Sequence, residues 1–187
     1  MNNPAIKFTI EEYMAIGESD KRYELIEGEL LVTPSPNVEH QRILRRLTDV
    51  IERFVEGNDL GEVFFSPLDV ILSDTNVVQP DLFFVAKNRL GIITRDNVQG
   101  PPDLIVEVLS PSTDARDRQL KRTIYSKYGV KEYWIVDPQA RTVEVLRVGP
   151  EWTGLALVSV IPEGGTLTTP LLPGLAVPVA VLFSDVH

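Results

Sequence analysis

Two short segments that are apolar almost throughout constrain the fold of this chain more than any other feature. They are residues 80–86 (PDLFFVA) and residues 103–110 (DLIVEVLS). Runs of this length are typical of strands that are buried on both faces of a sheet. Because side chains alternate along a strand, Glu107 shares one face with Ile105 and Leu109. The sequence therefore predicts a carboxylate inside the core of a sheet.

A carboxylate in such a position needs a partner, because a bare buried charge costs several kcal/mol. Asp81 opens the first segment directly after Pro80, and Glu107 lies within the second. Two carboxylates at the ends of neighbouring strands offer oxygen ligands to one hard divalent ion, and Mg²⁺ usually takes one or two carboxylates. The alternative is two structural acids, each paired with an arginine or capping a loop. The spacing alone leaves both interpretations open.

The remaining pattern predicts a mixed α/β fold in which strands dominate the middle of the chain. One helix follows Asn37 with a 3.6-residue apolar period and ends at Gly57, and a second runs from Ser112 or Thr113 to Tyr128. The expected strands are a hairpin over 23–32 with its turn at Glu27-Gly28, one bent or two separate strands over 61–73, and strands over 132–137, 142–148 and 155–161. Residues 162–178 are expected to form an irregular cap over the core.

The second helix adds candidate site residues. Asp117, Lys121 and Tyr125 follow one another at a spacing of four and share one stripe of a helix. A lysine beside two metal-bound carboxylates can orient or activate a water and offset charge on a phosphate. The alternative is an Asp–Lys surface pair worth a few tenths of a kcal/mol. Glu24, in the hairpin, is a third acid. His40 stands at the start of the first helix, where a histidine is more often a structural residue than a base.

Composition excludes several classes of function. The chain has no cysteine and two histidines, which excludes thiolate zinc sites, iron–sulfur clusters, cysteine nucleophiles and HExxH enzymes. The nucleotide-binding motifs GxxxxGK(S/T) and GxGxxG and the hydrolase motif GxSxG are absent. No apolar run reaches the ~18 residues of a membrane helix, and the N-terminal segment lacks a signal-peptide core. We therefore expect a cytoplasmic protein without a membrane partner.

The net charge of −9 argues against nucleic acid, but the average hides two basic clusters. The first spans residues 116–131, where six cations accompany one anion, and the second lies on the helix after Asn37. A surface that faces phosphates needs local positive charge, so nucleic acid stays open beside the alternative of solvated helix faces. The arginines assigned to a nucleic-acid backbone are Arg42, Arg45, Arg46, Arg116, Arg118 and Arg122.

A series of motifs then resembles a known family. In order, they are YELIEGEL, PSPNVEHQ, VVQPDLFFV, PDLIVEVLSPST, the stripe Asp117–Lys121–Tyr125 and YGVKEYWIVD. Their order and spacing are similar to those of the Uma family, which is similar to the PD-(D/E)XK nuclease superfamily. The resemblance covers about residues 8–150.

This resemblance implies a restriction-endonuclease-like core, an α/β (α+β) fold in which a mixed β-sheet is flanked by helices. It also implies hydrolysis of phosphodiester bonds with Mg²⁺, or Mn²⁺, and a nucleic-acid substrate, DNA rather than RNA. We expect one domain over residues 1–187, with 151–187 as a C-terminal strand and cap. Since nucleases of this fold often pair to cut two strands, a homodimer is expected, and the apolar tail 171–183 offers a contact surface.

The resemblance also implies roles for individual residues. Asp81 matches the aspartate of the PD element and Glu107 the acid of (D/E)XK, both as metal ligands, with the Val108 carbonyl as a further ligand. Leu109 stands where the lysine is expected, so the catalytic lysine is carried over to Lys121 on the following helix. Additional candidates for the site are Glu24, as a further metal ligand, and His40, Asp117 and Tyr125.

Two other functions compete with a nuclease. A non-cleaving nucleic-acid-binding or structural module on the nuclease fold would keep its acids for packing, and Leu109 and the acidic net charge favour it. The second alternative is a metal-dependent hydrolase of smaller phosphate esters. Metal-dependent cleavage of nucleic acid distinguishes a nuclease from the non-cleaving module, and assays with small phosphodiesters test for the hydrolase.

Overall fold

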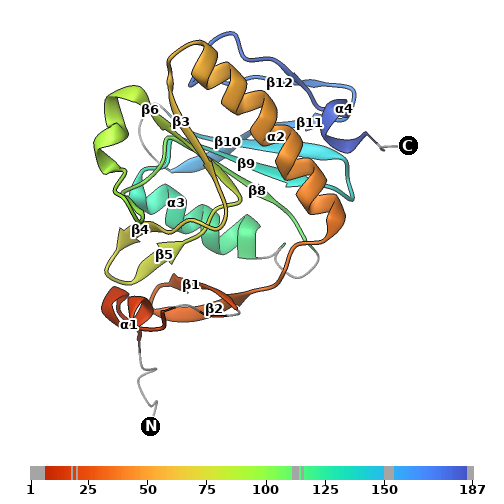
Figure 1. The fold of residues 1–187 in the computed structure, drawn as a ribbon. Helices are drawn as coiled ribbons and strands as arrows, with labels where there is room; N and C mark the ends of the chain where they lie inside the picture. The colour runs from red at the N-terminus through yellow and green to blue at the C-terminus, as the bar shows by residue number, and fades with distance from the viewer. Residues whose placement is uncertain are drawn as a thin grey trace.

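A six-stranded sheet, a five-stranded sheet, the short β12-β13 pair and the helices packed on them make up the described part of the fold (Figure 1). The computed structural model describes residues 7–17, 19, 21–110, 114, 116–149 and 154–184. The helices are α1 (Ile10–Met14), α2 (Val38–Gly57), the 3-10 helix η1 (Lys87–Ile92), the π-helix η2 (Arg116–Lys121), α3 (Arg122–Tyr128) and α4 (Ala180–Phe183). The strands are β1 (Arg22–Ile26), β2 (Glu29–Thr33), β3 (Gly61–Phe65), β4 (Val70–Ser73), β5 (Asn76–Val78), β6 (Leu82–Ala86), β7 (Val98–Gln99), β8 (Leu104–Val108), β9 (Glu132–Asp137), β10 (Thr142–Val148), β11 (Leu155–Pro162), β12 (Thr166–Leu167) and β13 (Val177–Pro178).

The larger sheet contains the two apolar segments at its centre. Its six strands lie in the order β11-β10-β9-β8-β6-β3, and β8 and β9 run parallel while the other neighbours are antiparallel. In β8, Leu104 and Val106 face one hydrophobic cluster and Ile105 faces another. The prediction of strands buried on both faces is confirmed, as is a mixed sheet flanked by helices.

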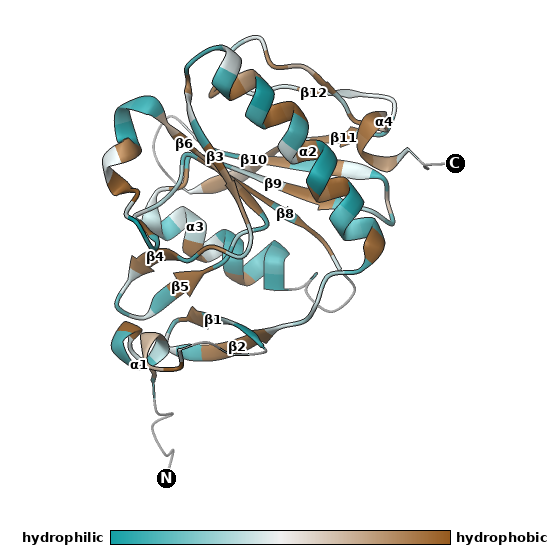
Figure 2. Ribbon diagram, in the orientation of Figure 1, coloured by the Kyte–Doolittle hydropathy of each residue, from teal (hydrophilic) through white to brown (hydrophobic). Residues whose placement is uncertain are grey.

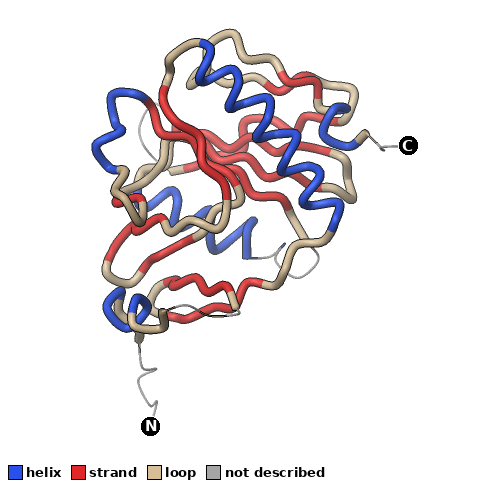
Figure 3. Tube along the Cα trace, viewed as in Figure 1, coloured by secondary structure: helices blue, strands red, loops and turns tan. Residues whose placement is uncertain are grey.

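Each face of this sheet is covered by a different layer. Helix α2 and the C-terminal segment cover one face, while α3 and the smaller sheet cover the other (Figures 1 and 3). The smaller sheet has the order β2-β1-β5-β4-β7, and α1 packs against β1 and β5. Helix α3 therefore lies between the two sheets, where side chains from both can reach it.

Helix α2 follows the predicted 3.6-residue period. The side chain of Asn37 caps it by accepting a hydrogen bond from the backbone N–H of His40 at 2.8 Å. Ile43, Leu47 and Ile51 are buried against the sheet, and the outward face is hydrophilic (Figure 2). The first turn of α2 thereby places His40 next to the central strands. No helix within the described ranges is long and apolar enough to cross a bilayer.

The segment after Pro111 differs from the single α-helix that the sequence predicts. Residues 116–121 form a π-helix, which continues as α3 to Tyr128. Gly129 ends α3 in the left-handed region, at φ 88°, where glycine carries no steric penalty, so this end of the helix is confirmed. The predicted caps Ser112 and Thr113 lie outside the described residues.

The C-terminal tail caps the core, as predicted, but it is more regular than expected. β12 pairs with β13, and α4 packs against α2. Leu172, Val177 and Leu182 are buried in the cluster that α2 covers. The prediction of a contact surface over 171–183 is therefore wrong for these side chains, because their apolar area is already used within the chain. No element is expected from the sequence between residues 87 and 102, where the structure has η1 and β7.

Candidate functional site

Strand register brings Asp81 and Glu107 together. β6 pairs with β8 antiparallel with Leu82 opposite Val106, so one further step along both strands places residue 81 opposite residue 107. The backbone N–H of Val108 donates to Oδ2 of Asp81 at 2.8 Å. Both carboxylates are buried and line one cavity of about 190 Å³, which we call the acidic cavity.

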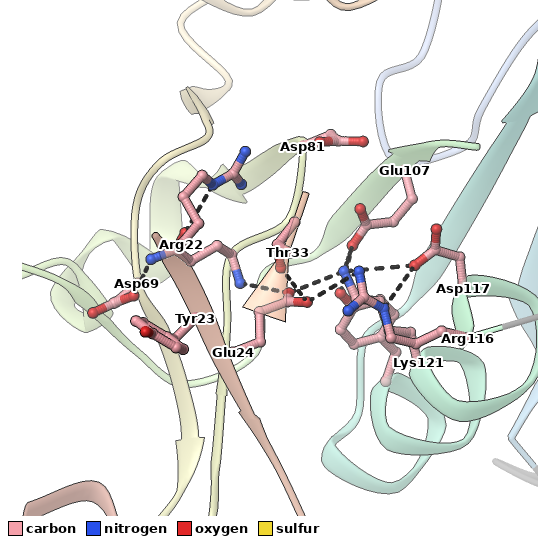
Figure 4. Close-up of polar contacts among 12 residues, drawn as sticks. Arg22, Tyr23, Glu24, Thr33, Asp69, Asp81, Glu107, Arg116, Asp117 and Lys121 are labelled. Atoms are coloured by element: carbon pink, nitrogen blue, oxygen red, sulfur yellow. Dashed lines mark hydrogen bonds and ion pairs between the residues drawn. The ribbon is translucent and has the colours of Figure 1, made fainter. Parts of the chain in front are cut away.

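Lys121 enters the acidic cavity from η2 and is almost fully buried. Its ammonium nitrogen lies 2.8 Å from Oε1 of Glu107 and 3.0 Å from Oε1 of Glu24, and 3.7 Å from Oδ1 of Asp117 (Figure 4). These acids come from β8, β1 and η2, so the lysine joins both sheets and the helix between them. The structure thus places Lys121 beside Glu107, one of the two strand carboxylates next to which the sequence predicts it.

Tyr125 completes the stripe on the helix. Its hydroxyl donates to the same Oε1 of Glu107 at 2.8 Å, and its ring packs edge-on against Tyr133 with the ring centroids 5.1 Å apart. Burial and the neighbouring charge of Glu107 raise the pKa of Tyr125 well above its usual value. Tyr125 is therefore a neutral donor that fixes the position of Glu107.

The protonation of the buried groups follows from their surroundings. Burial raises the pKa of Glu107 to about 8; Lys121 opposes this shift, and the charges of Asp81, Asp117 and Glu24 add to it. Burial alone would lower the pKa of Lys121, but Glu107, Glu24 and Asp117 raise it above its usual value. Lys121 is therefore a cation, and its charge opposes the rise in the pKa of Glu107 that burial and the neighbouring acids cause.

Glu24 differs from the additional metal ligand that the resemblance implies. Its Oε1 accepts from the backbone N–H of Gln79 at 3.0 Å and contacts Lys121, while its Oε2 accepts from Thr33 and lies 3.7 Å from Arg116. Burial opposes ionisation, but Lys121, Gln79 and Arg116 together lower the pKa of Glu24. Both oxygens are engaged, so the geometry fits a residue that holds Lys121.

His40, at the start of α2, contacts Asp81. Its Nε2 lies 2.9 Å from Oδ2 of Asp81. Its Nδ1 is buried and has no hydrogen-bond partner among the described residues. Because the same Asp81 oxygen also accepts from Val108, two partners fix the orientation of this carboxylate.

The remaining oxygens fit a divalent cation. Among the residues that the structure describes, Oδ1 of Asp81 and Oε2 of Glu107 accept no hydrogen bond, although both side chains line the acidic cavity. No group of three or more histidines and acids in the described part of the chain has the geometry of a metal site. Two carboxylates, completed by water and phosphate oxygens, are what Mg²⁺ usually takes from a protein. The chemistry of these two carboxylates therefore fits a hard ion, with the rest of its coordination left to other oxygens.

Comparison with known proteins agrees with this geometry. Residues 10–180 match the Uma2 family, described as "Putative restriction endonuclease". The chain belongs to this family. An uncharacterised protein of Synechocystis sp. is 31% identical over 125 residues, which span 66% of this chain and 64% of that protein. The crystal structure of "a putative nuclease belonging to DUF820" from Anabaena variabilis has a TM-score of 0.79 at 22% identity and covers 94% of this chain and 97% of its own. The restriction-endonuclease-like fold is thereby shown.

The arginines of this Uma2 protein fall into two groups. Arg42 and Arg45 are exposed on α2 and make no hydrogen bond or ion pair with the described residues. The others have partners within the chain: Arg46 donates to the carbonyl of Leu182, Arg116 lies beside Glu24 and Asp117, Arg118 is held by Asp114, Asp137 and Glu144, and Arg122 donates to the carbonyl of Leu155. Of the six, Arg42 and Arg45 are the ones that make neither a hydrogen bond nor an ion pair with the described residues.

Sequence reasoning did not identify Gln79 in this Uma2 chain. Its backbone N–H holds Glu24, and its side chain links Arg22 to Asp69 through hydrogen bonds of 3.2 and 2.8 Å. Gln79 and Arg22 both line the acidic cavity. The available signal was position, since Gln79 stands two residues before Asp81 and must lie at the same end of β6.

Proposed function

We propose that this chain is a metal-dependent nuclease that hydrolyses phosphodiester bonds of DNA. The observation that carries the proposal is that Asp81, Glu107 and Lys121 converge on one cavity. Asp81 directly precedes β6, Glu107 lies in β8 and Lys121 lies on η2. Membership of the Uma2 family supports it. Burying a lysine between carboxylates costs desolvation free energy. Groups whose pKa values are perturbed in this way concentrate at functional sites.

The proposed ligands are Asp81, Glu107 and the Val108 carbonyl. Mg²⁺ or Mn²⁺ held there would polarise a phosphate oxygen and lower the pKa of a bound water. Lys121, as a cation with donors directed at Glu107, orients that carboxylate and offsets negative charge next to the scissile phosphate. Tyr125 fixes Glu107, and Glu24 and Asp117 fix Lys121. His40 holds Asp81.

The substrate backbone is assigned to Arg42 and Arg45, the two exposed arginines that have no partner among the described residues. Arg42 and Arg45 lie three residues apart on α2 and so share one face. Phosphate contacts of this kind position a nucleic acid without reading its sequence. Arg118 is the weakest of the six candidates, because three carboxylates already neutralise it.

A non-cleaving module is the second candidate function. Leu109 takes the position of the usual lysine and is buried in the hydrophobic cluster that includes Tyr125 and Tyr133. In addition, Lys121 is shared among three carboxylates, which weakens its effect on a substrate. On this interpretation, the acidic network holds the two sheets together.

Cleavage assays decide between the two functions. Linear, single-stranded and branched DNA, RNA and a small phosphodiester are incubated with Mg²⁺ or Mn²⁺ and with a chelator. Wild-type protein is compared with Asp81→Asn and Glu107→Gln, and with Glu62→Gln, which changes an exposed acid on β3. Cleavage of DNA that needs metal, and is lost in the first two variants only, supports the nuclease. Binding without cleavage by wild-type protein supports the module.

Two further expectations stay predictions. A homodimer would allow both strands of a duplex to be cut, and sedimentation velocity of the full chain measures it. Limited proteolysis tests the single domain over residues 1–187, since a stable fragment ending near residue 150 would contradict it.

A further inference from the structure

A groove runs along α2 next to the acidic cavity. Its volume is about 590 Å³, within the range of roughly 300 to 1,000 Å³ typical of ligand sites. Pro36 and Asn37 line both the groove and the acidic cavity, so the two adjoin at these residues. We call it the α2 groove. One wall is α2, and the other contains Phe65 at the end of β3, the strand against which α2 packs (Figure 1).

Phe65 is an exposed aromatic side chain next to the candidate metal ligand. Its relative exposure is 55%, whereas the neighbouring Phe64 stacks on Phe83. Phe65 lies opposite Leu82 in the sheet, and the backbone N–H of Ser66 donates to the carbonyl of Asp81 at 3.0 Å. Backbone pairing thus fixes the main chain of Phe65 close to Asp81 in the sheet. An exposed aromatic ring next to a basic groove offers a face on which a base can stack.

The charges along the groove are ordered. Arg42 and Arg45 line the half that adjoins the acidic cavity, whereas Asp49 and Glu52 line the far half, and Asp49 is paired with Arg53 at 2.6 Å. Positive charge is therefore concentrated where the groove meets the cavity. An anionic chain that enters the acidic cavity from this half of the groove would pass both arginines and the ring of Phe65 before it reaches the carboxylates of the cavity.

We propose that the α2 groove binds an unpaired nucleotide of a DNA strand, with its base stacked on Phe65 and its phosphates on Arg42 and Arg45. Stacking on an aromatic ring needs a base whose face is free, which a base inside a duplex does not offer. The combination of a basic groove and an aromatic platform is the one that single-strand binding uses. The substrate class is accordingly DNA with an unpaired segment at the site of cleavage: single strands, flaps or frayed ends. This deepens the proposed nuclease function and rests on it for the cleavage step, whereas the binding step is measured without cleavage.

The experiment measures binding of short oligonucleotides to the full chain in chelator by fluorescence anisotropy. The probes are a single-stranded DNA, the same sequence as a blunt duplex, and its RNA counterpart. The variants are Phe65→Leu, which removes the ring, Phe65→Trp, which keeps one, and Val160→Ala, which changes an exposed apolar residue on β11. A 2-aminopurine base in the single strand reports stacking through quenching of its fluorescence.

We expect single-stranded DNA to bind more tightly than the duplex. Phe65→Leu should weaken this binding by about 5- to 100-fold, the effect of losing one stacked base, and abolish the quenching. Phe65→Trp should retain both, and Val160→Ala should match wild type. Equal binding of duplex and single strand, tighter binding of RNA, or unchanged affinity in Phe65→Leu would overturn the proposal. A change of sedimentation coefficient in Phe65→Leu without DNA would instead identify the groove as a contact between two copies of the chain.

The two proposals fail separately. If Phe65-dependent binding of single strands is observed but no DNA is cut with metal, the nuclease is excluded and the groove assignment stands. If DNA is cut and the cleavage of flaps and duplexes is equally insensitive to Phe65→Leu, the nuclease stands and the groove assignment is excluded.

Discussion

Lys121 lies on a helix and Glu107 on the central strand, yet the ammonium nitrogen of Lys121 is 2.8 Å from Oε1 of Glu107. Residue 109, two positions after Glu107 and on the same face of β8, is a buried leucine instead of a lysine. The π-helix η2 delivers the cation to this carboxylate from outside the strand. π-Helices are rare in proteins overall, and those that occur are often found at functional sites. This agrees with a role for Lys121 beyond packing.

Replacing Lys121 tests that role. Lys121→Met should lower metal-dependent cleavage by about 10²- to 10³-fold, because one electrostatic donor of the site is lost. It should also lower the free energy of unfolding by about 3 kcal/mol, since Glu24, Glu107 and Asp117 lose their common counter-ion. Cleavage rates and urea unfolding measure the two effects, and Lys127→Met, at an exposed lysine on α3, is the matched control.

A second variant separates catalysis from stability. In Lys121→Met/Leu109→Lys, a lysine extends from the strand on the face that carries Glu107, and part of the cleavage should return. If stability alone explains the loss in Lys121→Met, the double variant, which also buries a charge in an apolar cluster, will be less active still.

The sequence predicted the parts of the fold that depend on local pattern. The two apolar segments form β6 and β8, the 3.6-residue period forms α2 up to Gly57, and the Glu27-Gly28 turn joins β1 to β2. In each case the period of the apolar residues matches the structure that they form. The register of β6 and β8 then places Asp81 opposite Glu107 without any further information.

What the sequence did not reveal depends on packing between distant segments. The π-helix is closed by hydrogen bonds between residues five apart instead of four, and the apolar period over 116–128 does not encode this change. Glu24 reaches Lys121 because the small sheet packs against the helix layer, which no local pattern predicts. Arg118 looked like a free cation in the sequence, but Asp137 and Glu144 on neighbouring strands neutralise it.

Metal binding should stabilise the native protein measurably. An ion that binds only the folded state adds RT ln(1 + [L]/Kd), about 2.7 kcal/mol at a concentration one hundred times Kd. Mn²⁺ should therefore raise the Tm of wild-type protein, and a chelator should reverse the increase. Asp81→Asn should remove most of the increase, and Glu62→Gln should retain it. An equal rise of Tm in wild type and Asp81→Asn would exclude Asp81 as a ligand.

Asp103 should give the protein an acid-dependent part of its stability. It lies at the other end of β8 from the site, is buried, and contacts the Ala86 N–H at 2.9 Å, Arg89 at 3.0 Å and Lys131 at 2.6 Å. Burial opposes its ionisation, but these three partners lower its pKa below the usual value. Because the folded pKa is depressed, the stabilisation is present above the unfolded pKa and is lost as the pH falls through the folded pKa.

The variant Asp103→Asn isolates this contribution. At neutral pH it should lower the free energy of unfolding by about 1 to 3 kcal/mol, since hydrogen bonds to a charged group are replaced by weaker ones. Urea unfolding of both proteins from pH 7 down to acid should show the difference shrinking, with wild type losing stability and the variant losing less. A difference that is independent of pH would mean that Asp103 contributes through shape and not through charge.

Salt dependence tests whether Arg42 and Arg45 contact phosphates. Each phosphate contact releases condensed counter-ions, so the slope of log K against log[salt] falls in magnitude by about 1 for each lost contact with duplex DNA, and somewhat less for a single strand. Arg42→Gln and Arg45→Gln should each show this smaller slope and weaker binding of single-stranded DNA in chelator. Arg53→Gln is the control on the same helix, because its charge is already paired with Asp49 and its side chain does not line the α2 groove. If all three variants keep the wild-type slope, the DNA backbone does not follow α2, and the basic cluster on this helix is a solvated face.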